Sequence, residues 1–285
     1  SNTLERVAPL LARGAVPQVA VRPLVVEFNL RNPFIFASMN AMKPVFGDQS
    51  IEAQKEVYAG ADFRRHFNEE LARRTVFNNL WERVEVKEAE TAALRRLQWR
   101  SVADIARERG RDPLDVFFDL AIEDNLMLVY MIPLLDIDQE RVARKFSDSR
   151  TMIGISDGGA HVDMLCNAGY PTYLLGTFVR DKQALSLEHA VKRITSEPAA
   201  LFGIADRGRL KPGMAADIAI FDLDSVGSAE RPEVRSDLPG GGRRLITEAE
   251  GVKFTIVNGK ILYEDKRHSG VLPGRVLRSR QPPTA

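Results

Sequence analysis

Residues 151–165 read TMIGISDGGAHVDML: a short apolar run, a carboxylate, two glycines and a histidine. The run Met152–Ser156 has the length and apolar character of a buried strand, and the glycines predict a turn directly after it. Asp157 therefore stands at the carboxyl end of a predicted strand and is a candidate catalytic group. One acid does not make an active site, so further groups are expected from other segments.

A second strand is predicted early in the chain. The segment VPQVAVRPLVVEF (16–28) is rich in β-branched residues, and Pro23 marks a break directly after Arg22. A helical pattern precedes it, from Thr3, a good N-cap residue, to Gly14, where a helix would end. Helix, turn and strand together form half of a β/α repeat.

The rest of the chain is expected to alternate between helices and strands. Residues 30–100 mix proline-bearing loop with a helical pattern over 62–80, and we interpret them as an insertion. The other expected elements are helices at 101–110, 112–124, 138–146 and 186–203, the last bent or ended at Pro198, a strand within 208–224, and two strands joined by Asn258-Gly259, a strong hairpin signal.

Composition describes an ordinary globular protein. The 285 residues are 44% apolar and 28% charged, with a net charge of +1, so no electrostatic field favours nucleic acid or a membrane surface. The single cysteine, Cys166, cannot form an internal disulfide, which suits a reducing compartment. With no membrane-span pattern and no signal-peptide pattern, we expect a cytoplasmic location.

Several stretches together resemble one enzyme family. GISDGGAH (154–161), SLEHAVKRITSEPAALFGIADRGRLKPGMAADIAIFD (186–222) and VKFTIVNGKILYEDKRHSGVLPGR (252–275) are similar to the C-terminal half of the metal-dependent amidohydrolases. They resemble the N-acyl-D-amino-acid deacylase, or D-aminoacylase-like, branch in particular. The resemblance extends back through VPQVAVRPLVVEFNLRNPF (16–34), so it covers most of the chain.

The resemblance implies a fold and a chemistry. Members of this family have an α/β fold, a (β/α)8 TIM-type barrel with a metal site at the carboxyl ends of its strands, and a small β-sandwich domain. Asp157 matches the aspartate of the eighth strand, which in the family contacts the metal and acts as general base. The implied reaction is hydrolysis of a non-peptide amide C–N bond, with an acylated amino acid or related amide as substrate and Zn²⁺ as cofactor of the full-length parent.

The histidines that such a metal needs are missing from this chain. A hydrolytic zinc site takes roughly three protein ligands and keeps one position open. The four histidines are scattered through the sequence, at His66, His161, His189 and His268, with no His-x-His pair. We therefore expect this chain to bind no metal by itself and to be inactive alone.

Four residues besides Asp157 are candidates for substrate binding. Gly158 and Gly159 would let the backbone approach a ligand closely, although a plain turn explains them equally well. His161 would contact substrate or support Asp157, or would simply be an exposed turn residue. Arg22, at the end of the other predicted strand, could clamp a substrate carboxylate, the alternative being a structural salt bridge.

A count of strands points to an incomplete barrel. A complete barrel needs eight strand–helix units in about 250 residues, and only two convincing barrel-type strands can be placed, near 16–21 and 152–156. We expect residues 1–205 to be the C-terminal part of a barrel, with the insertion at about 30–100, and residues 206–285 to be the β-sandwich domain and tail. Open sheet edges predict homo-oligomerisation or other association.

Two other functions remain open from the sequence. One is a different amidohydrolase on the same barrel, either a cyclic amidohydrolase of the hydantoinase or dihydroorotase kind or a deaminase. The other is a noncatalytic module for binding or assembly.

Overall fold

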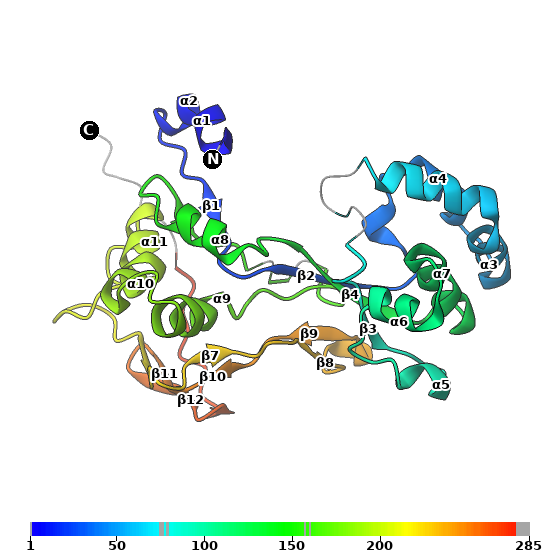
Figure 1. Ribbon diagram of the computed structural model, residues 1–285. Helices are drawn as coiled ribbons and strands as arrows, with labels where there is room; N and C mark the ends of the chain where they lie inside the picture. Colours follow the sequence, from blue (N-terminus) through cyan, green and yellow to red (C-terminus); the bar gives the residue numbers. More distant parts are fainter. Residues whose placement is uncertain (1, 74–76, 78–79, 157, 160, 278–285) are drawn as a thin grey trace. The chain divides into compact units, whose positions relative to one another are not determined.

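The computed structural model describes residues 2–73, 77, 80–156, 158–159 and 161–277 (Figure 1). The chain divides into two compact units. The terminal unit consists of Ser1–Arg22, Asp136–Val162 and Cys166–Ala285, and the inserted unit of Pro23–Leu135 and Asp163–Leu165. The inserted unit is thus longer than the insertion expected at 30–100. The expected boundary between residues 205 and 206 stays a prediction.

The inserted unit is built on a three-stranded antiparallel sheet in the order β2–β4–β3. The strands are β2 (Leu24–Phe28), β3 (Glu85–Glu88) and β4 (Val129–Leu135). Strand β4 was not among the expected elements, and it contains Pro133, a residue type that argues against a central strand. The pairing resolves this: β3 meets β4 only from Val129 to Met131, so Pro133 has a strand on one side only, where it pairs with Val25 of β2.

Helices supply the rest of the inserted unit. They are η1 (Phe34–Phe36), η2 (Asn40–Val45), α3 (Ile51–Ala59), α4 (Ala61–Leu71), α5 (Ala92–Arg95), α6 (Val102–Arg109) and α7 (Pro113–Glu123). Two of them start where the sequence predicts, because the Ser101 hydroxyl accepts a hydrogen bond from the amide of Asp104 and the Asp112 carboxylate accepts one from Leu114.

An aromatic core holds the inserted unit together. The Phe36 ring lies edge-on to Phe67 at 5.1 Å and to Phe77 at 5.4 Å, and Phe117 packs on Tyr130 of β4 at 4.5 Å. Such arrangements stabilise aromatic pairs beyond the area they bury. All of these rings are buried, and the whole cluster lies within residues 28–132.

The terminal unit contains the two strands predicted as barrel-type. Strands β1 (Gln18–Val19) and β5 (Met152–Ile153) pair in parallel, Gln18 opposite Met152. Parallel neighbours far apart in sequence are what a β/α architecture requires. Both strands are short and form a two-stranded sheet in the part of the chain that the structure describes. A partial barrel therefore stays a prediction.

The terminal unit also contains helices. They are α1 (Asn2–Arg6), α2 (Ala8–Leu11), α8 (Gln139–Phe146), α9 (Tyr170–Tyr173), the π-helical η3 (Leu174–Asp181), α10 (Leu187–Ile194) and α11 (Ser196–Leu201). The helix expected over 186–203 is interrupted at Thr195, whose ψ of −83° is not helical. Their core includes Phe146, Ile153, Leu174 and Phe178.

Short strands complete the terminal unit. A four-stranded sheet runs β13–β12–β11–β6, made of β6 (Ile218–Phe221), β11 (Val252–Val257), β12 (Lys260–Glu264) and β13 (Arg267–His268). The predicted Asn258-Gly259 turn joins β11 to β12, with positive φ at both residues. Two further pairs are β7 (Gly227–Ser228) with β10 (Ala249–Glu250), and β8 (Glu233–Arg235) with β9 (Arg244–Ile246). The turn between β8 and β9 includes η4 (Pro239–Gly241).

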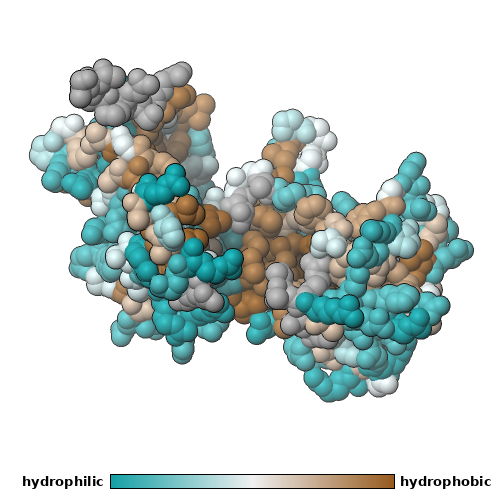
Figure 2. All heavy atoms as spheres, turned by 90° about the horizontal axis from the view of Figure 1, so that it is seen from above, coloured by the Kyte–Doolittle hydropathy of each residue, from teal (hydrophilic) through white to brown (hydrophobic). Residues whose placement is uncertain are grey.

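The surface carries apolar side chains among polar ones. Figure 2 shows brown, hydrophobic residues interleaved with teal, hydrophilic ones on one face of the molecule. Val16, Ile155 and Leu272 are among the exposed large apolar residues. No helix in the described part of the chain is long and apolar enough to cross a membrane.

Candidate active site

The loop that follows β5 carries the candidate residues of the opening stretch. Asp157 itself lies outside the described residues. Gly158, Gly159 and His161 are described, and all three are exposed. The Ser156 hydroxyl accepts a hydrogen bond from the Gly158 amide at 3.1 Å. The structure therefore places three of the predicted site residues on one short exposed loop.

The backbone of this loop is held in an uncommon conformation. Ile155 has a φ of +65°, which is an outlier for a β-branched side chain. His161 has a φ of +47° and Gly159 one of +91°, which favours glycine there. Strained backbone persists only where its surroundings enforce it, and it gathers at functional sites. The conformation supports a functional reading of the loop.

The start of β5 is supported by a buried arginine that the sequence did not single out. Arg193 of α10 is 3% exposed and donates to the Thr151 carbonyl oxygen at 2.7 Å and to the Thr151 hydroxyl at 3.1 Å. It also pairs with Glu197 at 2.8 Å. In the sequence, nothing distinguishes Arg193 from the other basic residues near the end of this helix as the one whose side chain is buried.

Arg22 lies just beyond β1 and is buried. Its Nη1 donates to the Ser228 hydroxyl and its Nη2 to the Ala229 carbonyl oxygen, both at 2.8 Å. Its guanidinium also lies 5.9 Å from the centre of the Tyr173 ring, in a cation–π arrangement. Burial lowers the pKa of Arg22 from its ordinary value. The structure places this residue against the chain leading into the β8–β9 hairpin, and substrate binding by Arg22 stays a prediction.

A hairpin that the sequence did not reveal contacts the loop after β5. The Leu245 amide of β9 donates to the Val162 carbonyl oxygen at 2.6 Å, and the Thr247 hydroxyl donates to the Cys166 carbonyl oxygen at 3.1 Å. The sequence signal was present, because two short runs, 233–235 and 244–246, flank a turn rich in proline and glycine.

The described residues do not form a metal site by themselves. Among them, no group of three or more histidine, cysteine, aspartate or glutamate side chains could hold a metal ion. The four histidines are exposed and lie on α4, the loop after β5, α10 and β13. We therefore assign no chemical step to a metal in the described part of the chain.

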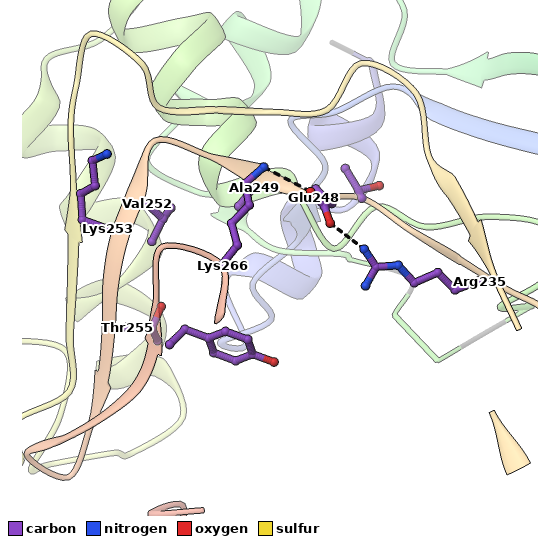
Figure 3. Close-up of a pocket in the computed structure, with 9 residues that line it drawn as sticks. Arg235, Glu248, Ala249, Val252, Lys253, Thr255 and Lys266 are labelled. Carbon is purple, nitrogen blue, oxygen red and sulfur yellow. Dashed lines mark hydrogen bonds and ion pairs between the residues drawn. The ribbon is translucent and has the colours of Figure 1, made fainter. Parts of the chain in front are cut away.

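A pocket of about 350 Å³ opens elsewhere in the terminal unit. Its charged side chains are paired with one another: Arg235 and Lys266 both point to Glu248, at 2.6 and 3.2 Å (Figure 3). Lys253 lies 3.7 Å from Asp265. Because the charges are already neutralised, this pocket gives less reason than the loop after β5 to be an active site.

The sequence profile of the amidohydrolase family matches residues 57–263, which is more than half of the chain. The chain belongs to the amidohydrolase family. The resemblance inferred from the quoted stretches is thereby confirmed. The matched range takes in the loop after β5 and the β8–β9 hairpin.

Related proteins indicate the branch of the family. The chain is 34% identical over 153 residues to N-acyl-D-glutamate deacylase of Alcaligenes xylosoxydans xylosoxydans, covering 50% of this chain and 27% of that protein. It is 31% identical over 186 residues to D-aminoacylase of the same organism, covering 64% of this chain and 34% of that protein. The chain thus spans about a third of the length of these relatives.

One solved structure has a similar fold. It is N-acyl-D-glutamate deacylase from Bordetella bronchiseptica, in complex with zinc and a phosphonate inhibitor that mimics the tetrahedral intermediate of the reaction. The TM-score is 0.50 at 22% identity, and the match covers 97% of this chain and 46% of that one. At this identity the likeness concerns the fold alone.

Proposed function

We propose that this chain is the C-terminal portion of a metal-dependent amidohydrolase that removes the acyl group from N-acyl-D-amino acids. The family match over residues 57–263 carries the proposal, and the deacylases among the relatives support the choice of substrate. The bond broken would be an amide C–N bond outside ordinary peptides. The substrate would be a small acylated amino acid.

Asp157 is the residue to which we assign the chemistry. A carboxylate can take a proton from the attacking water and return it to the leaving amine, as amide hydrolysis requires. Asp157 follows the end of β5 by four residues in sequence, and the strained backbone at Ile155 between them supports the assignment. In our proposal Asp157 is also one ligand of a zinc ion, and the other ligands belong to a longer polypeptide.

The residues proposed to contact substrate are those of the same loop, with Arg22. Gly158, Gly159 and His161 lie on one exposed segment, which favours their joint access to a ligand. Arg22 differs, because its guanidinium already serves acceptors within the terminal unit. Substrate binding by Arg22 would require it to exchange some of these partners.

The proposal is tested by metal analysis and a hydrolysis assay on this chain and on a protein extended to the length of its relatives. We expect the extended protein to hold zinc and to release free amino acid from N-acyl-D-amino acids, and this chain alone to do neither. Stoichiometric zinc with turnover in the isolated chain would overturn the view of it as a fragment. Opening of a cyclic amide without deacylation would overturn the proposed substrate.

Asp157 has a matched control within the same loop. Asp157→Asn in the extended protein should abolish turnover, since the amide cannot accept the proton. Asp163→Asn changes an exposed aspartate six positions further on and should leave turnover close to wild type. Equal activity of both variants would remove Asp157 from the mechanism.

A further inference from the structure

The segment from Ser228 to Thr247, which we call the clasp, contacts both strand ends that carry predicted site residues. At its start, Ser228 and Ala229 accept hydrogen bonds from Arg22, next to β1. At its end, Leu245 and Thr247 donate to the loop after β5. All of these groups belong to the terminal unit.

The clasp is stabilised by strand pairing, an ion pair and a buried side chain of its own. Strands β8 and β9 pair from Glu233–Ile246 to Arg235–Arg244. The turn is closed by a bidentate pair between Arg244 and Asp237, at 2.6 and 2.8 Å. A two-stranded hairpin alone is marginal in water. The Leu245 side chain supplies part of the missing stability, because it is 4% exposed.

The clasp contacts the loop after β5 at two residues that follow the candidate residues in sequence. Leu245 bonds the carbonyl of Val162, one residue after His161, and Thr247 bonds the carbonyl of Cys166. The Asn167 amide, adjacent to Cys166, closes the loop by donating to the Ser156 carbonyl oxygen at 3.0 Å. The loop is thus closed at its base by the bond between Asn167 and Ser156, and it is bonded to the clasp at Val162 and Cys166.

Thr247 and Ser228, the two ends of the clasp, both pack tightly against Gly169. A Cβ added to Gly169 would lie 2.8 Å from the Thr247 methyl carbon and 2.3 Å from the Ser228 hydroxyl oxygen. No side chain therefore fits at position 169 without displacing one end of the clasp. Gly169 allows the helix start at α9 to approach both ends of the clasp at once.

We propose that the clasp is a positioning element of the active site and that Thr247, through its hydrogen bond to Cys166, is the positioning residue. The clasp would hold the described part of the loop after β5, which carries His161, in its strained conformation. The role as an active-site element rests on the proposed function, whereas the mechanical link between clasp and loop does not. Hydrogen exchange can therefore test the link without substrate or metal.

The experiment compares amide hydrogen exchange in the intact chain and its variants, read by mass spectrometry on peptides covering 156–167 and 244–247. Thr247→Val keeps the shape and removes the hydroxyl, and it should speed exchange of both peptides by about 2- to 10-fold, the effect of losing one hydrogen bond. Thr247→Ser keeps the hydroxyl and should exchange as wild type does. Thr255→Val, the same change on β11, serves as control and should leave both peptides unchanged.

The serine variant separates hydrogen bonding from packing. If packing of the Thr247 methyl group were the whole role, Thr247→Ser would exchange faster and Thr247→Val would not, which would overturn the proposal. Unchanged exchange in Thr247→Val would overturn it too. Should Thr247→Val fail to fold, Asp237→Asn opens the exposed turn instead. Faster exchange at 156–167 then supports the link, and faster exchange confined to 236–243 contradicts it.

Discussion

The guanidinium of Arg22 and the hydroxyl of Ser228 are joined by a 2.8 Å hydrogen bond across 206 positions of sequence. This bond connects the end of the first parallel strand to the start of the clasp. A residue whose type suggested a substrate clamp is thus part of the internal framework of the terminal unit. Because Arg22 is buried, a structural role predicts a loss of stability when it is replaced, whereas a substrate-binding role predicts weaker binding.

Replacing Arg22 should cost stability. Arg22→Met would leave the Ser228 hydroxyl and the Ala229 carbonyl without their buried donor, and we expect a loss of about 2–4 kcal/mol in the free energy of unfolding. Urea denaturation followed by circular dichroism measures it. Arg209→Met, at an exposed arginine of the same unit, should change stability by less than about 0.5 kcal/mol. Wild-type stability with weaker substrate binding in Arg22→Met would favour the substrate clamp.

The inserted unit contains a buried ion pair between Glu27 of β2 and Lys87 of β3, whose side chains are 2% and 5% exposed. Strand β4 lies between these two strands, so the pair reaches across it. Removing one partner leaves the other as an unpaired buried charge. We expect Lys87→Met or Glu27→Gln to lower the free energy of unfolding by about 3–5 kcal/mol.

A double-mutant cycle checks this ion pair. Glu27→Leu combined with Lys87→Met buries no charge and should be more stable than either Glu27→Leu or Lys87→Met alone. The exposed pair of Arg107 with Asp104 gives the control, since Arg107→Gln should cost less than about 1 kcal/mol. Losses that simply add in the double variant would contradict coupling of the two charges.

Two phenylalanines of η1 test the aromatic core. Phe36 is fully buried among other rings, whereas Phe34, two residues earlier, is 50% exposed. Phe36→Ala should destabilise the protein by about 3–5 kcal/mol because it leaves a cavity. Phe34→Ala should cost much less. Chemical denaturation of the two variants measures both effects, and equal losses would show that the core is not where the structure places it.

Acid should weaken the turn that leads into β5. Hydrogen bonds from the Arg150 side chain and amide lower the pKa of Asp148 to about 2 from an ordinary 3.8. A carboxyl whose pKa is lower in the folded state stabilises the fold above its unfolded pKa and loses that contribution as the pH falls toward the folded one. Between about pH 4 and pH 2 wild type should therefore lose stability faster than Asp148→Asn. Parallel curves of melting temperature against pH would refute this.

Association of the chain is expected from its uncovered edges. Strands β1 and β5 form only a two-stranded sheet within the described residues, and Val16 and Ile155 beside them are exposed. Light scattering should show a mass above that of one chain, rising with concentration. Val16→Lys should reduce it, while Leu272→Lys, at an exposed position in the C-terminal segment, should not. A strict monomer for the unaltered chain would disprove the expectation.

Local sequence signals correctly predicted helix ends and turns that depend on a capping side chain or on a residue with positive φ. The Ser186 hydroxyl accepts from the amide of His189, and Gly110 ends α6 with a φ of +61°, both as expected. Asn258-Gly259 forms the predicted hairpin turn. These signals act within a few residues, so one sequence contains all the information they need.

Features that depend on distant partners were missed. Strand β4 contains Pro133, which is tolerated only because β3 stops short of it. The clasp depends on Val162 and Cys166, far from Leu245 in sequence. For the candidate site, the sequence could group Gly158, Gly159 and His161, because they are contiguous. The inward turn of Arg193 and the internal partners of Arg22 follow from tertiary packing that no local pattern encodes.

Leu24 and Leu135, the outer ends of strands β2 and β4, face each other in the sheet register. The Pro23–Leu135 segment of the inserted unit thus begins and ends on neighbouring strands, about 5 Å apart. A short turn could bridge that gap, so the excursion between β2 and β4 could be deleted, or exchanged for another, without stretching the polypeptide around it. What lies between these two leucines could then vary as a cassette, as long as β2 is kept, because the Glu27 amide of β2 donates to the Met164 carbonyl oxygen in the loop after β5.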